Sequence, residues 1–170
     1  MAADVVSADQ VYQITGEGYA PAGGILRNGQ TLAAGADPLL TAFARAAYWC
    51  NDARLHEQEG EWRTEGDPME GALLALAGKI SGQGGQAFGG HTRLDAVPFD
   101  AAHRYMAVLS LDSDGLPHIY VKGAPEALLA MCAQQRTPEG NAPLDADYWL
   151  QQVEKLAEKM QSLHVGSGFD

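Results

Sequence analysis

Basic residues are scarce in this sequence. Eleven lysines and arginines stand against 22 aspartates and glutamates, which gives a formal net charge of −11 over 170 residues. Nucleic acids and anionic membrane surfaces are bound through a surplus of lysine and arginine, so this balance argues against both as partners. A small polyanion held by a local basic cluster remains compatible with it, and Arg93, Arg104 and Lys122 are the basic residues of a modest one.

Cysteine is also rare, and nothing in the sequence has the spacing of a metal site. Cys50 and Cys132 lie far apart and form no CxxC pair. A disulfide between them is formally possible, but two buried thiols in a reducing compartment fit this usage better. The histidines and cysteines are too scattered for zinc, and no group of carboxylates has metal-ligand spacing. We therefore expect no metal ligands in this chain.

Long apolar runs are absent as well. No stretch approaches the ~20 residues that a membrane-spanning helix needs, and the first ten residues do not resemble a signal peptide. The glycine-rich stretch 81–90 lacks the GxxxxGK[ST] pattern of a phosphate loop, and we interpret it as a surface linker. We expect one soluble, intracellular domain over residues 1–170, with residues 1–10 poorly ordered.

Capping and turn signals divide the rest of the chain into helices and strands. Asp37, Asp67 and Asp145 each precede a helical pattern and are predicted N-caps. Alternating patterns predict strands over 11–15, 54–58, 61–64, 93–99, 105–111 and 119–121. We expect 137–143 to be a loop and 163–170 to begin a further strand that then stops. Antiparallel hairpins mixed with helices predict an α+β fold, an antiparallel twisted sheet with helices packed on its faces.

The most informative stretch runs from Pro98 to Glu126. Its two strands are joined by a polar turn, Asp112 to Gly115, with residues that favour tight turns. The second strand ends at Lys122, after which Gly-Ala-Pro-Glu is typical of a turn that starts a helix. A cation at the end of a strand, beside an apolar sheet face, indicates an anion site.

Three motifs resemble the nucleotide-binding domain of P-type cation-pumping ATPases. Residues 122–126 (KGAPE) match that family's lysine motif, residues 66–73 (GDPMEGAL) resemble its GDPTEGAL, and residues 98–106 (PFDAAHRYM) resemble its PFDSxRKxM. They occur in the expected order within about 60 residues, and GDPMEGAL and the PFD of the third motif suit the type II, calcium-pump-like branch. Met69 and His103 depart from the family pattern, and His164 stands where the family has an arginine.

The resemblance implies a binding site for ATP. Phe99 would stack on the adenine ring, Glu70 would accept a hydrogen bond from the adenine amino group, and Lys122 with Gly123 would lie deep in the pocket. Arg104 is the basic residue retained near the phosphates, and Mg²⁺ would arrive with the nucleotide. Without the resemblance, Phe99 is simply a strand residue, Glu70 favours the helix dipole, and Lys122 is an exposed lysine.

The resemblance also implies what this chain does not contain. The family's phosphorylated aspartate lies in a DKTGT motif, and that string does not occur here. We therefore expect no catalytic residue, and interpret the chain as the monomeric nucleotide-binding part of a larger membrane pump. It would lie in the cytoplasm, and its partners would be the phosphorylation and actuator domains. The alternatives are a degenerate interaction or regulatory module with the same fold and, less consistent with the missing motifs, a free-standing kinase or hydrolase.

Overall fold

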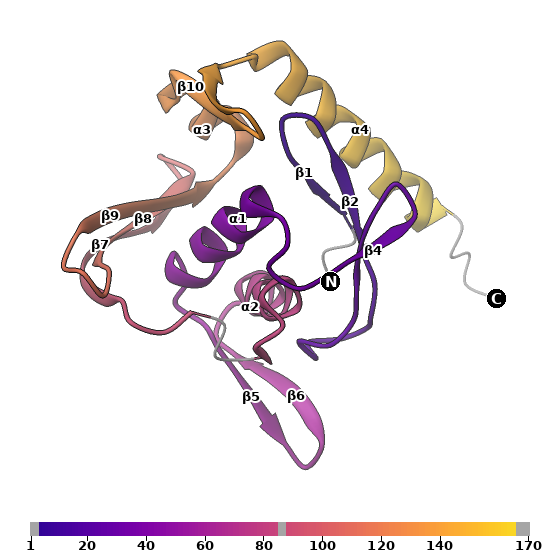
Figure 1. Ribbon diagram of the computed structural model, residues 1–170, viewed down its shortest axis with the longest axis vertical. Helices are drawn as coiled ribbons and strands as arrows, with labels where there is room; N and C mark the ends of the chain where they lie inside the picture. Colours follow the sequence, from indigo (N-terminus) through magenta and orange to yellow (C-terminus); the bar gives the residue numbers. More distant parts are fainter. Residues whose placement is uncertain (1–3, 85–87, 166–170) are drawn as a thin grey trace.

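A computed structural model describes residues 4–84 and 88–165, with the backbone alone for 160–165 (Figure 1). In chain order the elements are β1 (Asp4–Val6), β2 (Val11–Ile14), β3 (Ile25–Arg27), β4 (Gln30–Leu32), α1 (Pro38–Trp49), β5 (Arg54–Gln58), β6 (Glu61–Glu65), α2 (Pro68–Ser81), β7 (Thr92–Asp100), β8 (Tyr105–Leu111), β9 (Pro117–Gly123), α3 (Pro125–Met131), β10 (Gln134–Thr137), β11 (Gly140–Pro143) and α4 (Ala146–Val165). Strands pair antiparallel throughout these residues, which confirms the α+β class. They are divided among four sheets.

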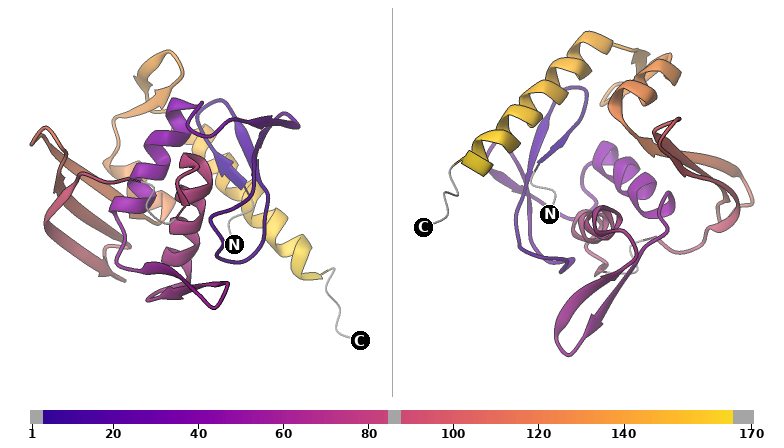
Figure 2. Two further views of the ribbon diagram at one scale, coloured as in Figure 1. Left: turned by 60° about the horizontal axis from the view of Figure 1, so that its bottom comes forward. Right: turned by 180° about the vertical axis from the view of Figure 1, so that it is seen from behind.

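Helices α1 and α2 lie between two of these sheets (Figures 1 and 2). The sheet β1–β4 packs on one side of the helix pair, and apolar side chains of this sheet and of both helices form the larger core. Burying these side chains is the main favourable contribution to folding. The members of this first core are Val5, Tyr12, Ile25, Leu40, Ala44, Leu76, Ala77 and Ile80.

The sheet β7–β9 lies on the other side of the helix pair (Figure 2). Strand β8 is its central strand, and its buried residues alternate, because successive side chains of a strand point to opposite faces. Met106 and Val108 pack with Cys50, at the end of α1, in a second and smaller core. This face of the sheet is therefore the one turned toward α1.

Helix α2 begins where the sequence indicates and approaches its neighbours closely. The carboxylate of Asp67 accepts hydrogen bonds from the backbone N–H groups of Met69 and Glu70, which confirms the predicted cap. A Cβ at Gly71 would come within 1.7 Å of Thr64 Oγ1 on β6, so only glycine allows this approach. The close fit fixes the first turn of α2 and thus the position of Glu70.

Several sequence predictions need correction. Asp4–Val6 forms β1, paired with β2, where we expected no order through residue 10. Residues 137–143, predicted as a loop, belong to the hairpin β10–β11. Residues 163–165 continue α4 rather than begin a strand, and 166–170 lie outside the described residues. The short strands β3 and β4 had no sequence signal that we recognised.

Across residues 4–84 and 88–165, the structure contains no helix that is both long enough and apolar enough to span a bilayer.

Candidate functional site

Two of the predicted binding residues meet in an ion pair. Lys122 Nζ lies 2.5 Å from Glu70 Oε1, although the residues are 52 positions apart in the sequence. Lys122 is the register partner of buried Met106, so its side chain leaves the sheet on the face turned toward α1. The two side chains are 23% and 15% exposed, respectively. The pair is therefore largely shielded from water, and part of each side chain stays exposed.

The turn after α1 holds the other side of Glu70. Its second carboxylate oxygen, Oε2, accepts a hydrogen bond from the backbone N–H of Asp52 at 3.1 Å. Its carbonyl oxygen accepts one from Asn51 Nδ2 at 3.0 Å. Sequence reasoning missed both Asn51 and Asp52. A polar Asn-Asp pair at the end of a predicted helix was the one signal that could have indicated them.

Each arginine of the predicted basic cluster has its own carboxylate partner. Arg93 Nη1 on β7 lies 2.6 Å from Asp52 Oδ1, and it also donates to the carbonyl oxygen of Asn51 at 3.4 Å. Arg104 Nη1 lies 3.9 Å from Glu126 Oε2 on α3. Like Lys122, each of these arginines thus has its positive charge paired with a carboxylate of the same chain. An anion entering this region must therefore compete with the carboxylates.

Phe99 lies on β7 with 62% of its surface exposed. β8 separates β7 from β9, so Phe99 and Lys122 lie on the two outer strands of this sheet. The ladder between β7 and β8 is irregular between Val97 and Asp100, which brackets Phe99. Such irregularities re-aim side chains next to functional sites. An exposed aromatic ring on a strand offers a flat surface for stacking, and its contact with adenine stays a prediction.

Arg104 and Gly123 meet through their backbones. Arg104 has a left-handed backbone, with φ of 59°, at the end of the turn between β7 and β8. Its carbonyl oxygen accepts a hydrogen bond from Ala124 N–H at 2.8 Å. A Cβ on Gly123 would lie 2.4 Å from that oxygen, so glycine is required here by the close approach. This contact fixes the end of β9, directly after Lys122.

Cys50 lies beneath the ion pair. Its thiol is buried and donates to the carbonyl oxygen of Met106 at 3.5 Å. Burial raises the pKa of this thiol, and the nearby ammonium of Lys122 opposes that shift only in part. Because burial is the larger effect, the pKa stays raised and the thiol is unreactive at neutral pH. Cys132 is exposed, so the prediction of two buried thiols is wrong for it.

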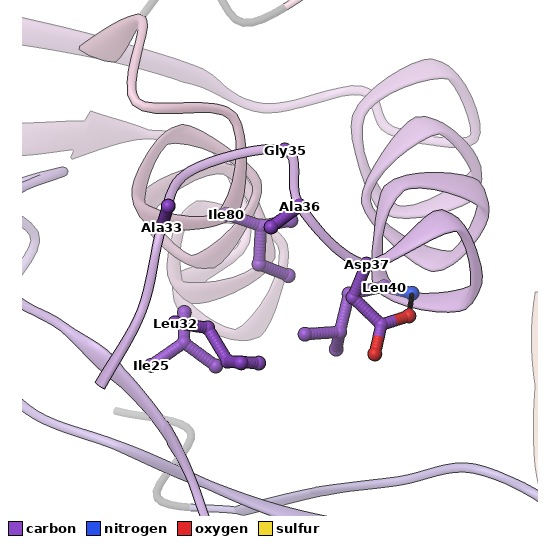
Figure 3. A pocket seen from close by; sticks show the side chains of 8 residues that line it. All are labelled: Ile25, Leu32, Ala33, Gly35, Ala36, Asp37, Leu40 and Ile80. Atoms are coloured by element: carbon purple, nitrogen blue, oxygen red, sulfur yellow. Dashed lines mark hydrogen bonds between the residues drawn. The ribbon is translucent and has the colours of Figure 1, made fainter. Parts of the chain in front are cut away.

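A separate small hollow lies between the first core and the start of α1 (Figure 3). It is lined mainly by aliphatic side chains of β3, β4, α1 and α2, with the capping carboxylate of Asp37 at its edge. Its cavity volume of about 10 Å³ is roughly that of one water-sized sphere. No predicted binding residue lines it, and it is too small for a nucleotide. Among the described residues, no group of three or more His, Cys, Asp or Glu side chains could hold a metal ion.

The sequence matches a known protein family over most of its length. The model of the family described as P-type ATPase, cytoplasmic domain N, matches residues 39–166. Cation-transporting ATPase pma1 of Synechocystis is 33% identical over 161 residues, covering 91% of this chain and 18% of that protein. A calcium-transporting ATPase of Bacillus subtilis is 29% identical over 125 residues, covering 74% and 14%. Calcium-transporting ATPase type 2C member 1 of Bos taurus is 31% identical over 123 residues, covering 71% and 12%. The chain thus spans less than a fifth of the length of these relatives.

Proposed function

Because the chain belongs to the family of P-type ATPase cytoplasmic N domains, we propose that it binds ATP at the end of the β7–β9 sheet. The observation that carries the proposal is the contact between Lys122 and Glu70, which joins two separate sequence motifs. A cation and a hydrogen-bond acceptor held together in a partly shielded place are two of the groups that ATP recognition needs. Phe99, on the same sheet, supplies the third.

The residues have distinct roles in this proposal. Phe99 stacks on the adenine ring, and Glu70 accepts a hydrogen bond from the adenine amino group. Lys122 and Arg104 attract the anionic part of the nucleotide, and Gly123 lets the backbone after Lys122 come close to the turn at Arg104. Mg²⁺ is bound to the phosphates and is brought in by the nucleotide.

In an intact pump, this domain delivers ATP to a neighbouring phosphorylation domain. The γ-phosphate passes to an aspartate of that domain, and an actuator domain takes part in the later steps. Phosphoryl transfer gains most of its rate from positioning and from charge stabilisation. A domain that holds ATP in a fixed orientation therefore contributes without supplying a reacting group. The transport of a cation, as in the named relatives, would follow from this transfer.

Calorimetric titration with Mg-ATP tests the proposal. The Lys122→Ala variant should bind ATP at least about tenfold more weakly than the wild type, since a hydrogen bond to a charged group contributes about 1.5–3 kcal/mol. Lys155→Ala is the matched control, because Lys155 is exposed on α4, away from the β7–β9 sheet (Figure 1). Its affinity should equal that of the wild type.

Circular dichroism and thermal melting must accompany the titration, because Lys122→Ala leaves the mostly buried Glu70 carboxylate without its partner. If the folded wild type gives no binding heat at several millimolar ATP, the proposal fails. The degenerate interaction module then becomes the better account.

A further inference from the structure

We infer that Asn51 is a positioning residue for nucleotide recognition, an inference that rests on the proposed ATP-binding function. Asn51 lies directly after the end of α1, at the point where α1, β5 and α2 meet. Its role is to hold Glu70 in place, so that the Glu70 carboxylate can form the ion pair with Lys122 and accept a hydrogen bond from the adenine amino group.

The hydrogen bonds of the Asn51 side chain carry this inference. Its Nδ2 donates to the carbonyl oxygen of Ala47 at 3.1 Å and to that of Glu70 at 3.0 Å. Its Oδ1 accepts from the backbone N–H of Ala53 at 2.9 Å. An amide side chain has two N–H donors and one carbonyl acceptor group, and all of them are used here. No shorter or differently charged side chain can make the same three contacts.

The turn that Asn51 holds also positions the Glu70 carboxylate, through a backbone N–H group. With Asn51 holding the turn, the N–H of Asp52 points at Glu70 Oε2, at 3.1 Å. Glu70 Oε1 remains for Lys122. The main chain and both carboxylate oxygens of Glu70 are therefore fixed from separate directions. Groups that must read a ligand need this kind of support, because a small misplacement weakens recognition strongly.

The same turn is also connected to the strand that carries Phe99. Arg93 on β7 donates to the carbonyl oxygen of Asn51 and forms an ion pair with Asp52. The turn at Asn51 and Asp52 thus contacts α1, α2 and β7, and through Glu70 it contacts β9. It is the point at which the elements bearing Glu70, Lys122 and Phe99 are linked to one another.

The test compares the affinities for ATP and for inosine triphosphate, which has an oxygen in place of the adenine amino group. A correctly placed Glu70 accepts from that amino group, so the wild type should prefer ATP by at least about tenfold. Asn51→Ala should lower this preference toward one. Asn51→Asp should do the same, since it keeps the acceptor for Ala53 but loses both Nδ2 donors. It also serves as the second variant if Asn51→Ala does not fold.

Asp37→Ala is the matched structural control. Asp37 caps the other end of α1 and accepts from the N–H groups of Leu39 and Leu40. Its loss should lower the melting temperature but leave the preference for ATP at the wild-type value. If Asn51 contributed to stability alone, its variants would behave like Asp37→Ala. They would lower the melting temperature and leave the preference for ATP unchanged.

The outcomes separate the two proposals. If the wild type binds ATP and prefers it, but both Asn51 variants keep that preference, the inference is overturned while the ATP-binding function stands. A wild type that binds both nucleotides equally also overturns the inference, because Glu70 then does not read the amino group. A wild type that binds neither overturns both proposals.

Discussion

The sheets β1–β4 and β7–β9 lie on opposite sides of α1 and α2 but contribute different kinds of contact (Figure 2). The first buries aliphatic and aromatic side chains against both helices. The second buries only a small cluster around Cys50, and its polar side chains form ion pairs with the first turn of α2 and with the turn after α1. One region thus provides most of the apolar burial, and the other presents charged and aromatic groups near the surface.

Under the proposed function, this difference separates the region that stabilises the fold from the region that binds the nucleotide. Burial of apolar surface is non-directional and tolerates little polar chemistry. Binding a nucleotide needs exposed or partly shielded polar groups in fixed places, which contribute less to folding. A region that must remain open to a ligand therefore depends on a neighbouring core to hold it. Helices α1 and α2 belong to both regions and connect them.

The largest expected effect comes from removing a side chain of the first core. Ile25 is 5% exposed, so Ile25→Ala should lower the free energy of unfolding by about 2–5 kcal/mol. Ile119 on β9 is 70% exposed, and Ile119→Ala should change it by less than about 0.5 kcal/mol. Urea unfolding of both variants measures this contrast. If both variants lost the same free energy of unfolding, the two sheets would not differ in how much these side chains contribute to stability.

A smaller effect, now on binding, is expected at Phe99. Stacking of a base on an aromatic ring contributes about 1–3 kcal/mol, so Phe99→Ala should weaken ATP binding by roughly 5- to 150-fold. Its free energy of unfolding should stay within about 0.5 kcal/mol of the wild type, because the ring is largely exposed. Phe99→Trp should retain most of the affinity. If Phe99→Ala lowered the free energy of unfolding but bound ATP with wild-type affinity, Phe99 would contribute to stability and not to binding.

The smallest expected effect is on the pH dependence of stability, and it arises from Tyr12 in the first core. Burial, together with the hydrogen bond to Asp37, raises the pKa of Tyr12 from 10.0 to about 12. The folded state then keeps a proton that the unfolded state releases, so the contribution of Tyr12 is complete below pH 10 and is lost as the pH rises toward 12. The stability advantage of the wild type over Tyr12→Phe should fall by roughly 1.4 kcal/mol per pH unit in that window.

The comparison of these two proteins isolates Tyr12 from other alkaline titrations. Burial lowers the pKa of Lys79, which changes stability in the opposite direction, but this effect is common to both proteins and cancels. Urea unfolding at several pH values between 9 and 12 would measure the difference. Parallel curves for the two proteins would contradict a buried, hydrogen-bonded Tyr12.

Features with local causes could be predicted from the sequence. The helices after Asp37 and Asp67 begin as predicted, because a cap and a following proline act within a few residues. The hairpin β8–β9 also follows from its own turn residues. The hairpin β10–β11 was missed, although its Glu139 and Gly140 match the Glu59 and Gly60 that join the two predicted strands of the hairpin β5–β6.

Features that depend on contacts between distant segments could not be predicted from residue patterns. Strand β1 has three residues and exists only through its pairing with β2 and its contact with the first core. The ion pair between Glu70 and Lys122 joins segments 52 residues apart, and no periodicity encodes it. The resemblance to a family indicated both residues, but not that they touch. It gave no indication of Asn51, whose three hydrogen bonds depend on how α1, β5 and α2 meet.

A map of backbone amide chemical shifts during titration with Mg-ATP would locate the nucleotide site directly. If ATP binds at the proposed site, saturable shifts should cluster around Glu70, Phe99 and Lys122, with the amides of β1–β4 nearly unchanged. That result would identify the β7–β9 sheet and the start of α2 as the nucleotide site. Shifts centred on β1–β4, or no shifts from a well-folded protein at several millimolar ATP, would rule out this nucleotide site.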